Sequence, residues 1–149
     1  MSLPSFSAVA ESLLAAGVSI RFRAGGRSMR PALRDGDHLT VAPIAARDVR
    51  VGDVVLCTMP RGPVAHRVRA IDAAVEGVAR FVLRGDAAMA PDRPAAGPQI
   101  WGRVVRAERD GRAFPVGGVL RRRVALVKVR LREAIAEARA FAVARPATR

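Results

Sequence analysis

The sequence predicts a mainly β domain of antiparallel strands, with a short helix before it and an amphipathic helix after it. Between Ser19 and Val105, short apolar or alternating segments recur, and Gly, Asp and Pro residues separate them as turn signals. The two ends instead show the spacing of helices. Half of the 149 residues are apolar and 26% are charged, so we expect one domain with a real core rather than a disordered chain.

The chain begins with a predicted helix and a predicted edge of the sheet. We expect the helix at Ser5–Ala16, because a serine can cap its start and Gly17 can end it. A strand is expected at Ser19–Ala24, where Ile20 and Phe22 alternate with two arginines. This alternation is typical of a strand with one buried face.

The middle of the chain predicts further strands, each introduced or ended by a turn signal such as Asp-Gly, Gly-Asp or Gly-Pro. We interpret Ala90–Pro98, which is rich in Pro, Ala and Gly, as a loop, and Arg109–Arg112 as a hairpin turn. The remaining predicted strands are His38–Ala42, Val54–Thr58, Val64–Ile71, Val78–Leu83 and Ile100–Ala107.

The last segment changes character. Apolar residues of Leu126–Ala144 fall on one helical face, and Pro146 ends the pattern, although alternation in Val124–Val129 leaves a strand possible at its start. The predicted organisation is a helical segment at 1–18, a β domain at 19–118 and a basic amphipathic helix at 119–149.

The net charge of +13 raises the question of an anionic partner. Only Lys128 of the 26 basic residues is a lysine, and aromatic residues make up 4%, so an Ala/Arg-rich composition explains the charge better than a nucleic-acid interface does. Residues 119–149 carry nine Arg or Lys and two Glu. That helix can lie on an anionic membrane surface, but packing on the β domain or against a partner protein is the favoured interpretation.

Several classes of protein are disfavoured by what the sequence lacks. Cys57 is the single cysteine and His38 and His66 are the two histidines, so we expect no disulfide framework, no metal site and no cofactor. No apolar run reaches the roughly 20 residues of a membrane-spanning helix, and the N-terminus lacks the layout of a signal peptide. The expectation is a cytoplasmic protein or one peripheral to a membrane.

Three separate elements carry chemistry, and each is weak alone. Ser28 follows a glycine pair, where a serine hydroxyl can face a cleft, but serines in such turns are usually structural. His66 lies on a predicted strand, 38 residues later, where most histidines are packing residues. Asp86, in a Gly-Asp pair, and Asp92 follow the next predicted strand.

Taken together, these elements resemble the signal peptidase I family and the related LexA-type self-cleaving repressors. The likeness spans about residues 19–105. In that clan, two strands follow the nucleophile, and a later strand carries the base. The base is a lysine in the bacterial and LexA branches. In the archaeal and endoplasmic-reticulum-type branch it is a histidine, followed by a Gly-Asp box and a second aspartate. The matching segments are Gly26-Arg27-Ser28-Met29, Asp35-Gly36-Asp37-His38-Leu39-Thr40-Val41, Gly52-Asp53-Val54-Val55, His66-Arg67-Val68 and Leu83-Arg84-Gly85-Asp86, with Asp92 close behind.

The resemblance implies a LexA/signal-peptidase-like fold and a serine peptidase that cleaves an extended, leader-like peptide after a small residue. Ser28 would be the nucleophile and His66 the general base, with activity rising as the imidazole deprotonates. Asp86 or Asp92 would orient the imidazole, and the Ser28 N–H would stabilise the oxyanion. The resemblance also places Gly26, Met29 and Pro31 in the substrate-binding part of the site.

The sequence departs from the family pattern at three points. Gly26 stands where many members have a serine or threonine that adds an oxyanion donor, and Arg27 stands where glycine is frequent. A slow enzyme is therefore expected, since one such donor contributes about 10²- to 10³-fold in rate. The third departure is that no membrane anchor, which signal peptidases normally have, is expected from this sequence.

Two alternatives to a leader peptidase remain at this stage. One is a non-catalytic module of the same fold that binds an extended peptide at a sheet edge. The other is a self-cleaving regulator, for which Ala16–Gly17 and Ala24–Gly25 offer small-residue bonds, although both lie close to Ser28. We expect Cys57 to be a buried thiol and Trp101 to pack in the core or at a sheet edge.

Overall fold

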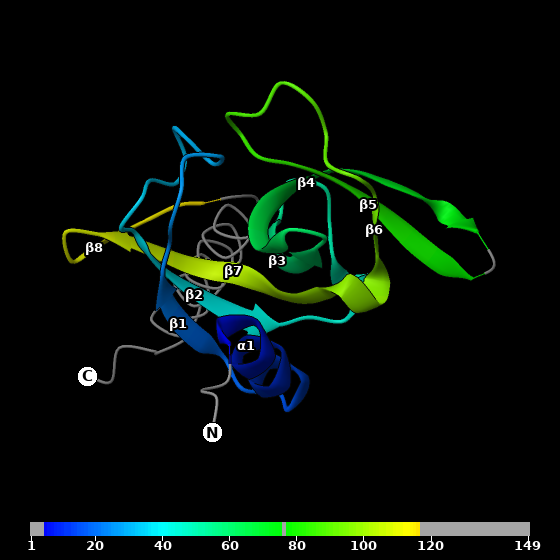
Figure 1. The fold of residues 1–149 in the computed structure, drawn as a ribbon, viewed down its shortest axis with the longest axis horizontal. Helices are drawn as coiled ribbons and strands as arrows, with labels where there is room; N and C mark the ends of the chain where they lie inside the picture. The colour runs from blue at the N-terminus through cyan, green and yellow to red at the C-terminus, as the bar shows by residue number, and fades with distance from the viewer. Residues whose placement is uncertain (1–4, 76, 117–149) are drawn as a thin grey trace, which may run out of the picture.

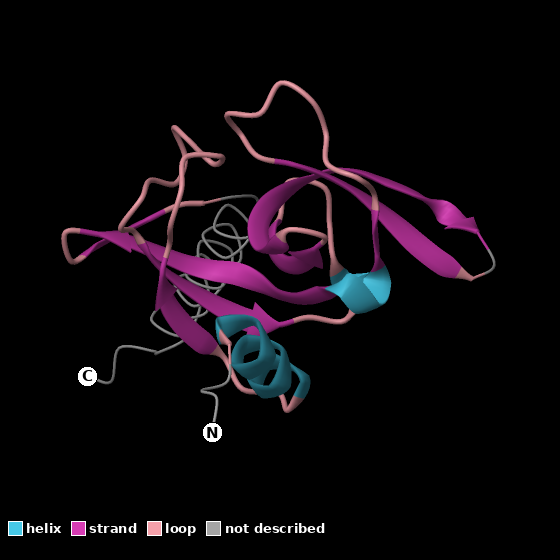
Figure 2. Ribbon diagram, viewed as in Figure 1, coloured by secondary structure: helices cyan, strands magenta, loops and turns pink. Residues whose placement is uncertain are grey.

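The computed structural model describes residues 5–75 and 77–116, and within them it is dominated by one antiparallel sheet of eight strands. Figures 1 and 2 show this sheet with the α-helix of the described residues lying against it. The mainly β prediction and the short N-terminal helix are thereby confirmed. The predicted helix at Leu126–Ala144 lies outside the described residues.

Helix α1 spans Phe6–Ala15, within the predicted range. The Ser5 hydroxyl accepts a hydrogen bond from the Ala8 N–H at 3.3 Å, so Ser5 is the N-cap. Gly17, with φ of +83°, takes the left-handed conformation that commonly ends a helix.

The strands follow in the order β1-β2-β7-β3-β4-β5-β6 across the sheet, and β8 pairs with β7. Strand β7 is therefore central, because it pairs with β2 on one side and β3 on the other. The bounds are β1 Ile20–Arg23, β2 His38–Pro43, β3 Val54–Met59, β4 Gly62–Val75, β5 Val78–Arg84, β6 Ala95–Ala96, β7 Ile100–Arg109 and β8 Arg112–Phe114.

Several predicted boundaries were wrong. Strand β4 ends at Val75 rather than Ile71, and β7 ends at Arg109 rather than Ala107. Strand β4 begins at Gly62 rather than Val64, because the residues interpreted as a turn already pair with Met59 and Thr58 of β3. The predicted loop Ala90–Pro98 contains β6, whose two alanines carry no alternation pattern and pair with Arg80 and Phe81 of β5. Two short 3₁₀ helices, Ala46–Asp48 and Gly97–Gln99, were also not predicted.

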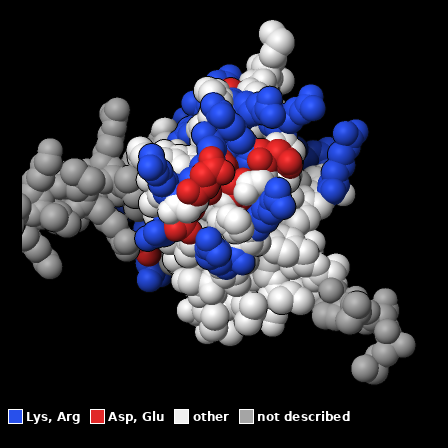
Figure 3. Space-filling model, turned by 90° about the vertical axis from the view of Figure 1, so that its left-hand side faces the viewer, with Lys and Arg blue, Asp and Glu red and all other residues white. Residues whose placement is uncertain are grey.

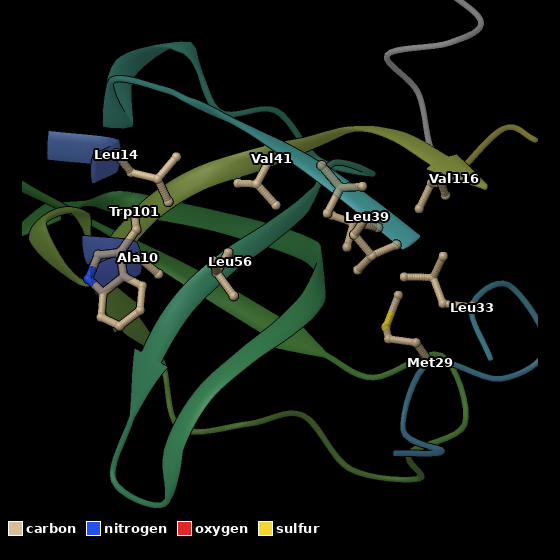
Figure 4. Packing of buried hydrophobic residues seen from close by; sticks show 12 residues of the cluster. Ala10, Leu14, Met29, Leu33, Leu39, Val41, Leu56, Trp101 and Val116 are labelled. Carbon is tan, nitrogen blue, oxygen red and sulfur yellow. The ribbon is translucent and has the colours of Figure 1, made fainter. Parts of the chain in front are cut away.

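Helix α1 packs on the sheet beside Gly102, a residue of β7 that has no side chain. A Cβ on Gly102 would lie 2.6 Å from Val41 and 3.2 Å from Leu14. The absence of a side chain there lets the helix and β2 approach β7 closely, and Leu14 fills the space. Figure 4 shows the resulting cluster, in which Met29 and Leu33 reach from the loop after β1 towards Leu39.

A second cluster lies on the opposite face of β3 and β7, where residues alternate between the two clusters. Cys57, Val68, Phe81 and Leu83 are all at most 1% exposed, and they join β3, β4 and β5. The prediction that Cys57 is buried is confirmed. Trp101, 8% exposed on β7, belongs to the first cluster, as expected for a packing residue.

Two turns of the same sequence type, Arg-x-Gly-Asp, lead into β2 and β3. In each turn the aspartate, Asp37 or Asp53, accepts a hydrogen bond from the N–H of the arginine three residues earlier, at 2.8 and 2.9 Å. In each, β7 supplies a second arginine to the carboxylate. Arg109 binds Asp37 through two hydrogen bonds of 2.8 Å, and Arg103 lies 3.5 Å from Asp53. These turns fix the starts of the strands beside the site.

Candidate active site

Ser28 lies in the loop between β1 and β2, which rises at the left of Figure 1. Gly26 has φ of +92°, and its N–H donates to the Asp35 carboxylate at 3.1 Å, so one turn of the loop is tied to another. Met29 is 6% exposed and anchors the loop in the core. The nucleophile candidate therefore stands exposed on a loop that is held from both sides.

Strand β4 brings His66 to this loop. The Nε2 atom of His66 lies 2.9 Å from the Ser28 hydroxyl, and its Nδ1 atom lies 2.5 Å from a carboxylate oxygen of Asp92. His66 itself is 7% exposed. With the proton on Nδ1, the imidazole donates to Asp92 and presents a free nitrogen lone pair to the serine hydroxyl. This is the relay that a serine nucleophile requires.

The loop after β5 supports both ends of this relay. The Ala87 N–H donates to the Ser28 carbonyl at 2.9 Å, and the Asp92 N–H donates to the Leu83 carbonyl at 2.8 Å. Gly85 lies directly against Ser28, since a Cβ there would lie 2.4 Å from the Ser28 carbonyl oxygen. The glycine of the Gly-Asp pair is therefore required by the close approach of the Ser28 backbone.

Asp86 does not contact His66 in this arrangement. Its two oxygens accept from Arg67 at 2.8 and 2.7 Å, and Arg69 donates a further bond of 2.8 Å. Burial raises the pKa of Asp86, but the hydrogen bond and charges of these arginines, with that of Arg84, outweigh it and hold the pKa below its usual value.

Arg67 in turn ties three segments together. Besides the carboxylate of Asp86, it donates to the carbonyls of Gly52 and Val116 at 3.0 and 2.9 Å. The Asp86 hydrogen bond raises the pKa of the Arg67 guanidinium. The pair thus braces the loop that carries Gly85 and Ala87 beneath Ser28.

A cleft of about 390 Å³ opens beside Ser28. Its floor is apolar, and Phe6 of α1 also lines it, with its ring against that of Phe22 edge to face at 5.1 Å between centroids. One wall comes from the end of β1 and the loop after it, and the other from the start of β4. The lining residues are Phe6, Phe22, Arg23, Ala24, Gly25, Gly26, Ser28, Met29, Leu33, Arg34, Leu39, Leu56, Pro63, Val64 and Ala65.

The remaining predicted site residues divide in two. Gly26 and Met29 line the cleft beside Ser28. Pro31 is exposed, follows a cis peptide bond and is not among the lining residues. Cys57 is not a reactive thiol, because burial, with a smaller effect of the Asp92 charge, raises its pKa to about 12.

The sequence did not predict the residues that support the site or line the cleft through tertiary contacts. Arg67 follows His66 directly, and an arginine next to a predicted base could have indicated an ion pair close to the site. Phe6 and Arg34 gave no signal, because only the folded chain brings the helix and the turn before β2 to the cleft.

Comparison of the chain with protein-family models, with curated proteins and with solved structures finds no match. Within residues 5–75 and 77–116, no group of three His, Cys, Asp or Glu side chains is arranged to hold a metal ion. In the same part of the chain, no helix is long and apolar enough to cross a membrane.

Proposed function

We propose that this protein is a serine endopeptidase, with Ser28 as nucleophile, His66 as general base and Asp92 as the group that orients the base. The observation that carries the proposal is the continuous chain of contacts from the Ser28 hydroxyl through His66 to Asp92, at 2.9 and 2.5 Å, beside an open cleft. Each atom stands within the distance that proton transfer needs.

The first half of the reaction forms an acyl-enzyme. Ser28 Oγ attacks the peptide carbonyl carbon while its proton moves to His66 Nε2, and Asp92 stabilises the imidazolium that results. The tetrahedral intermediate collapses when the C–N bond breaks, and the proton on Nε2 passes to the departing amine. The acyl group is then esterified to Ser28.

The second half restores the enzyme. His66 takes a proton from water, whose oxygen attacks the ester carbonyl, and the second tetrahedral intermediate releases the acid as Ser28 Oγ recovers its proton from Nε2. The Ser28 N–H is the oxyanion donor we assign. No side-chain donor stands at Gly26, so we expect a modest rate.

An extended peptide is the substrate shape that the cleft favours. In the described sheet, β1 pairs only with β2 along one edge, and β4 from Gly62 to His66 pairs only with β3. Residues Phe22–Gly26 and Pro63–Ala65, next to these open edges, form the two walls of the cleft. A peptide strand lying between them can use their free backbone groups, and its side chains would enter the apolar floor.

The fold and branch that we propose are those of the signal peptidase and LexA clan, in its histidine-base branch. The order nucleophile loop, base on a later strand, Gly-Asp turn and second aspartate supports this assignment, as do the mostly β sheet and the site beside Ser28. The preference for a small residue before the cleaved bond follows from the same resemblance.

Self-cleavage is the less favoured form of this activity. At one of the two small-residue bonds, the Ala24 carbonyl accepts from the Gly36 N–H at 2.8 Å and the Ala24 N–H donates to the Asp37 carbonyl at 2.7 Å. Cleavage there in the same molecule would break the wall of the cleft itself.

Peptide cleavage read by mass spectrometry tests the proposal. Wild type and Ser28→Ala meet a pool of alanine-rich, leader-like peptides at about pH 6 and about pH 8. We expect fragments from wild type alone, formed faster at the higher pH because the base acts as the neutral imidazole. Ser28→Ala should lower the rate about 10⁴- to 10⁶-fold.

Other outcomes have definite meanings. Retention of the same peptides by both proteins without cleavage would favour a non-catalytic peptide-binding module. A rate that rises only far above neutral pH would contradict histidine as the base. Shortening of the chain itself, lost in Ser28→Ala, would favour the self-cleaving regulator.

A further inference from the structure

We propose that the cleft selects peptides that carry an acidic side chain, which Arg23 and Arg34 bind at the rim of the cleft. This inference rests on the proposed peptidase function and names a substrate class for the same site. It also makes a prediction about binding that holds whether or not the bound peptide is cleaved.

Two arginines from different elements converge on the cleft. Arg23 ends β1 and Arg34 lies in the turn before β2, and both line the cavity beside Ser28. Gly36 provides the space for this arrangement. A Cβ on Gly36 would lie 3.1 Å from a guanidinium nitrogen of Arg23, so the Arg23 side chain lies over the turn that contains Arg34.

Two carboxylates, Asp35 and Asp37, lie in the same turn as Arg34, and each accepts at least one hydrogen bond from another residue. Asp35 accepts from the Gly26 N–H, and both oxygens of Asp37 accept from Arg109. The Arg109 hydrogen bonds, with a smaller contribution from the charge of Arg34, lower the pKa of Asp37, which is 2% exposed and does not face the solvent in the cleft. Among the described residues, neither Arg23 nor Arg34 forms an ion pair.

The surrounding surface has the same sign of charge. The loop from Ala24 to Asp37 also carries Arg27 and Arg30, both exposed and without an ion pair in the described part of the chain. On the side of the molecule that bears this loop, basic side chains surround a smaller group of acidic ones (Figure 3). An anionic ligand is attracted to such a face, and the attraction is strongest where the solvent is partly excluded.

The shape of the cleft favours a peptide as the source of that anion. Met29, Leu39 and Leu56 form an apolar, buried floor. Only a ligand with apolar side chains that enter the cavity can contact this floor. A guanidinium binds a carboxylate with two parallel hydrogen bonds. We therefore expect a ligand that places apolar side chains against the floor and a Glu or Asp against the arginines at the rim, and one extended peptide can do both.

The test uses three matched sets of alanine-rich peptides, which carry Glu, Gln or Lys respectively at a single position. Within each set, that position is varied along the peptide. We expect wild type to cleave the best Glu peptide with a kcat/KM about tenfold above its Gln counterpart, the value of one charge-assisted contact. The Lys peptide should be poorer than both. Ser28→Ala should bind the same peptides with the same order of affinity, measured by fluorescence anisotropy.

Variants assign the preference to the two arginines. Arg23→Gln and Arg34→Gln should each reduce the Glu-over-Gln ratio of kcat/KM, and together should bring that ratio to about one. Arg80→Gln is the control, because Arg80 is an exposed arginine on β5 that does not line the cleft. Its Glu-over-Gln ratio should equal that of wild type.

The two hypotheses fail in different ways. Cleavage of Glu, Gln and Lys peptides at equal rates would overturn the acidic preference and leave the peptidase standing. No cleavage, but Glu-selective binding that the double variant loses, would overturn the peptidase and leave the preference. Equal binding of all peptides, or no binding of any, would overturn the acidic preference. It would also be overturned if the protein showed no selectivity among peptides but bound phosphatidylglycerol vesicles through both arginines.

Discussion

His66 and Arg67 are neighbours on β4, and each is bound by one aspartate of the loop after β5, yet the two pairs do different things. His66 binds Asp92 on the face of the strand that meets Ser28, at 2.5 Å. Arg67 binds Asp86 on the opposite face, where two oxygens and two nitrogens meet at 2.8 and 2.7 Å. Consecutive strand residues point to opposite faces, which separates the two pairs.

The difference lies in what each aspartate leaves free. Asp92 engages one nitrogen of a ring whose other nitrogen faces the Ser28 hydroxyl, so in the proposed mechanism its charge acts on the proton transfer. Asp86 receives bonds from Arg67 and Arg69, so its charge is neutralised within the structure. In the proposed mechanism the first aspartate tunes the chemistry, whereas the second holds in place the loop that supports Ser28.

Asp92→Asn should break the first pair with the largest effect. The amide no longer stabilises the imidazolium and can hold the ring with its proton on the wrong nitrogen, so we expect kcat to fall about 10⁴-fold. The melting temperature should change little. Steady-state cleavage with thermal denaturation measures both, and activity within tenfold of wild type would contradict the assignment of Asp92.

Gly85→Ala should give the next largest effect, because Gly85 belongs to the turn that the two pairs share. The new Cβ would lie 2.4 Å from the Ser28 carbonyl oxygen, so the loop that carries Ser28 must move. A shift of about 1 Å at reacting atoms costs about 10²-fold in rate.

The control for that variant is Gly97→Ala, whose Cβ would meet Ala46 at 3.0 Å, far along the chain from Ser28. It should lower stability without a specific loss of activity. Equal losses of activity in the two variants would mean that Gly85 matters only for folding.

The sequence alone predicted the elements of this site better than their pairing. Helix α1 and the longer strands follow from periodicity and turn residues, and Ser28 and His66 were identified from their motifs. Which aspartate meets His66 was left open, because both Asp86 and Asp92 lie in a loop. The direction of a loop side chain depends on tertiary contacts, here the Ala87 and Asp92 backbone hydrogen bonds.

Other features had no local signal at all. Strand β6 consists of two alanines, and its strand character comes only from pairing with β5. The cleft joins α1, the end of β1 and the start of β4, which are remote in sequence. Such non-local features arise from the topology of the sheet rather than from any window of residues.

Asp86→Asn should break the second pair and mainly lower stability, by about 2 kcal/mol, since it leaves Arg67 without its charged partner. Because the pKa of Asp86 is lowered in the folded protein, its contribution is present above the ordinary carboxyl pKa and is lost as pH falls through the folded value. The stability difference between wild type and variant should therefore narrow in acid. Urea denaturation across a pH series measures it, and a constant difference would contradict this account.

Arg69→Gln should give the smallest effect and sharpens the comparison within the second pair. Arg69 donates one bond of 2.8 Å to Asp86, and its side chain is 37% exposed, against 15% for Arg67. Exposed ion pairs contribute about 0.2–1 kcal/mol, because water screens them and the long side chain loses freedom. We expect a loss of stability within that range and wild-type kcat/KM, measured by the same denaturation and cleavage assays. A loss as large as that of Asp86→Asn would mean that Arg69, rather than Arg67, holds the loop beneath the nucleophile.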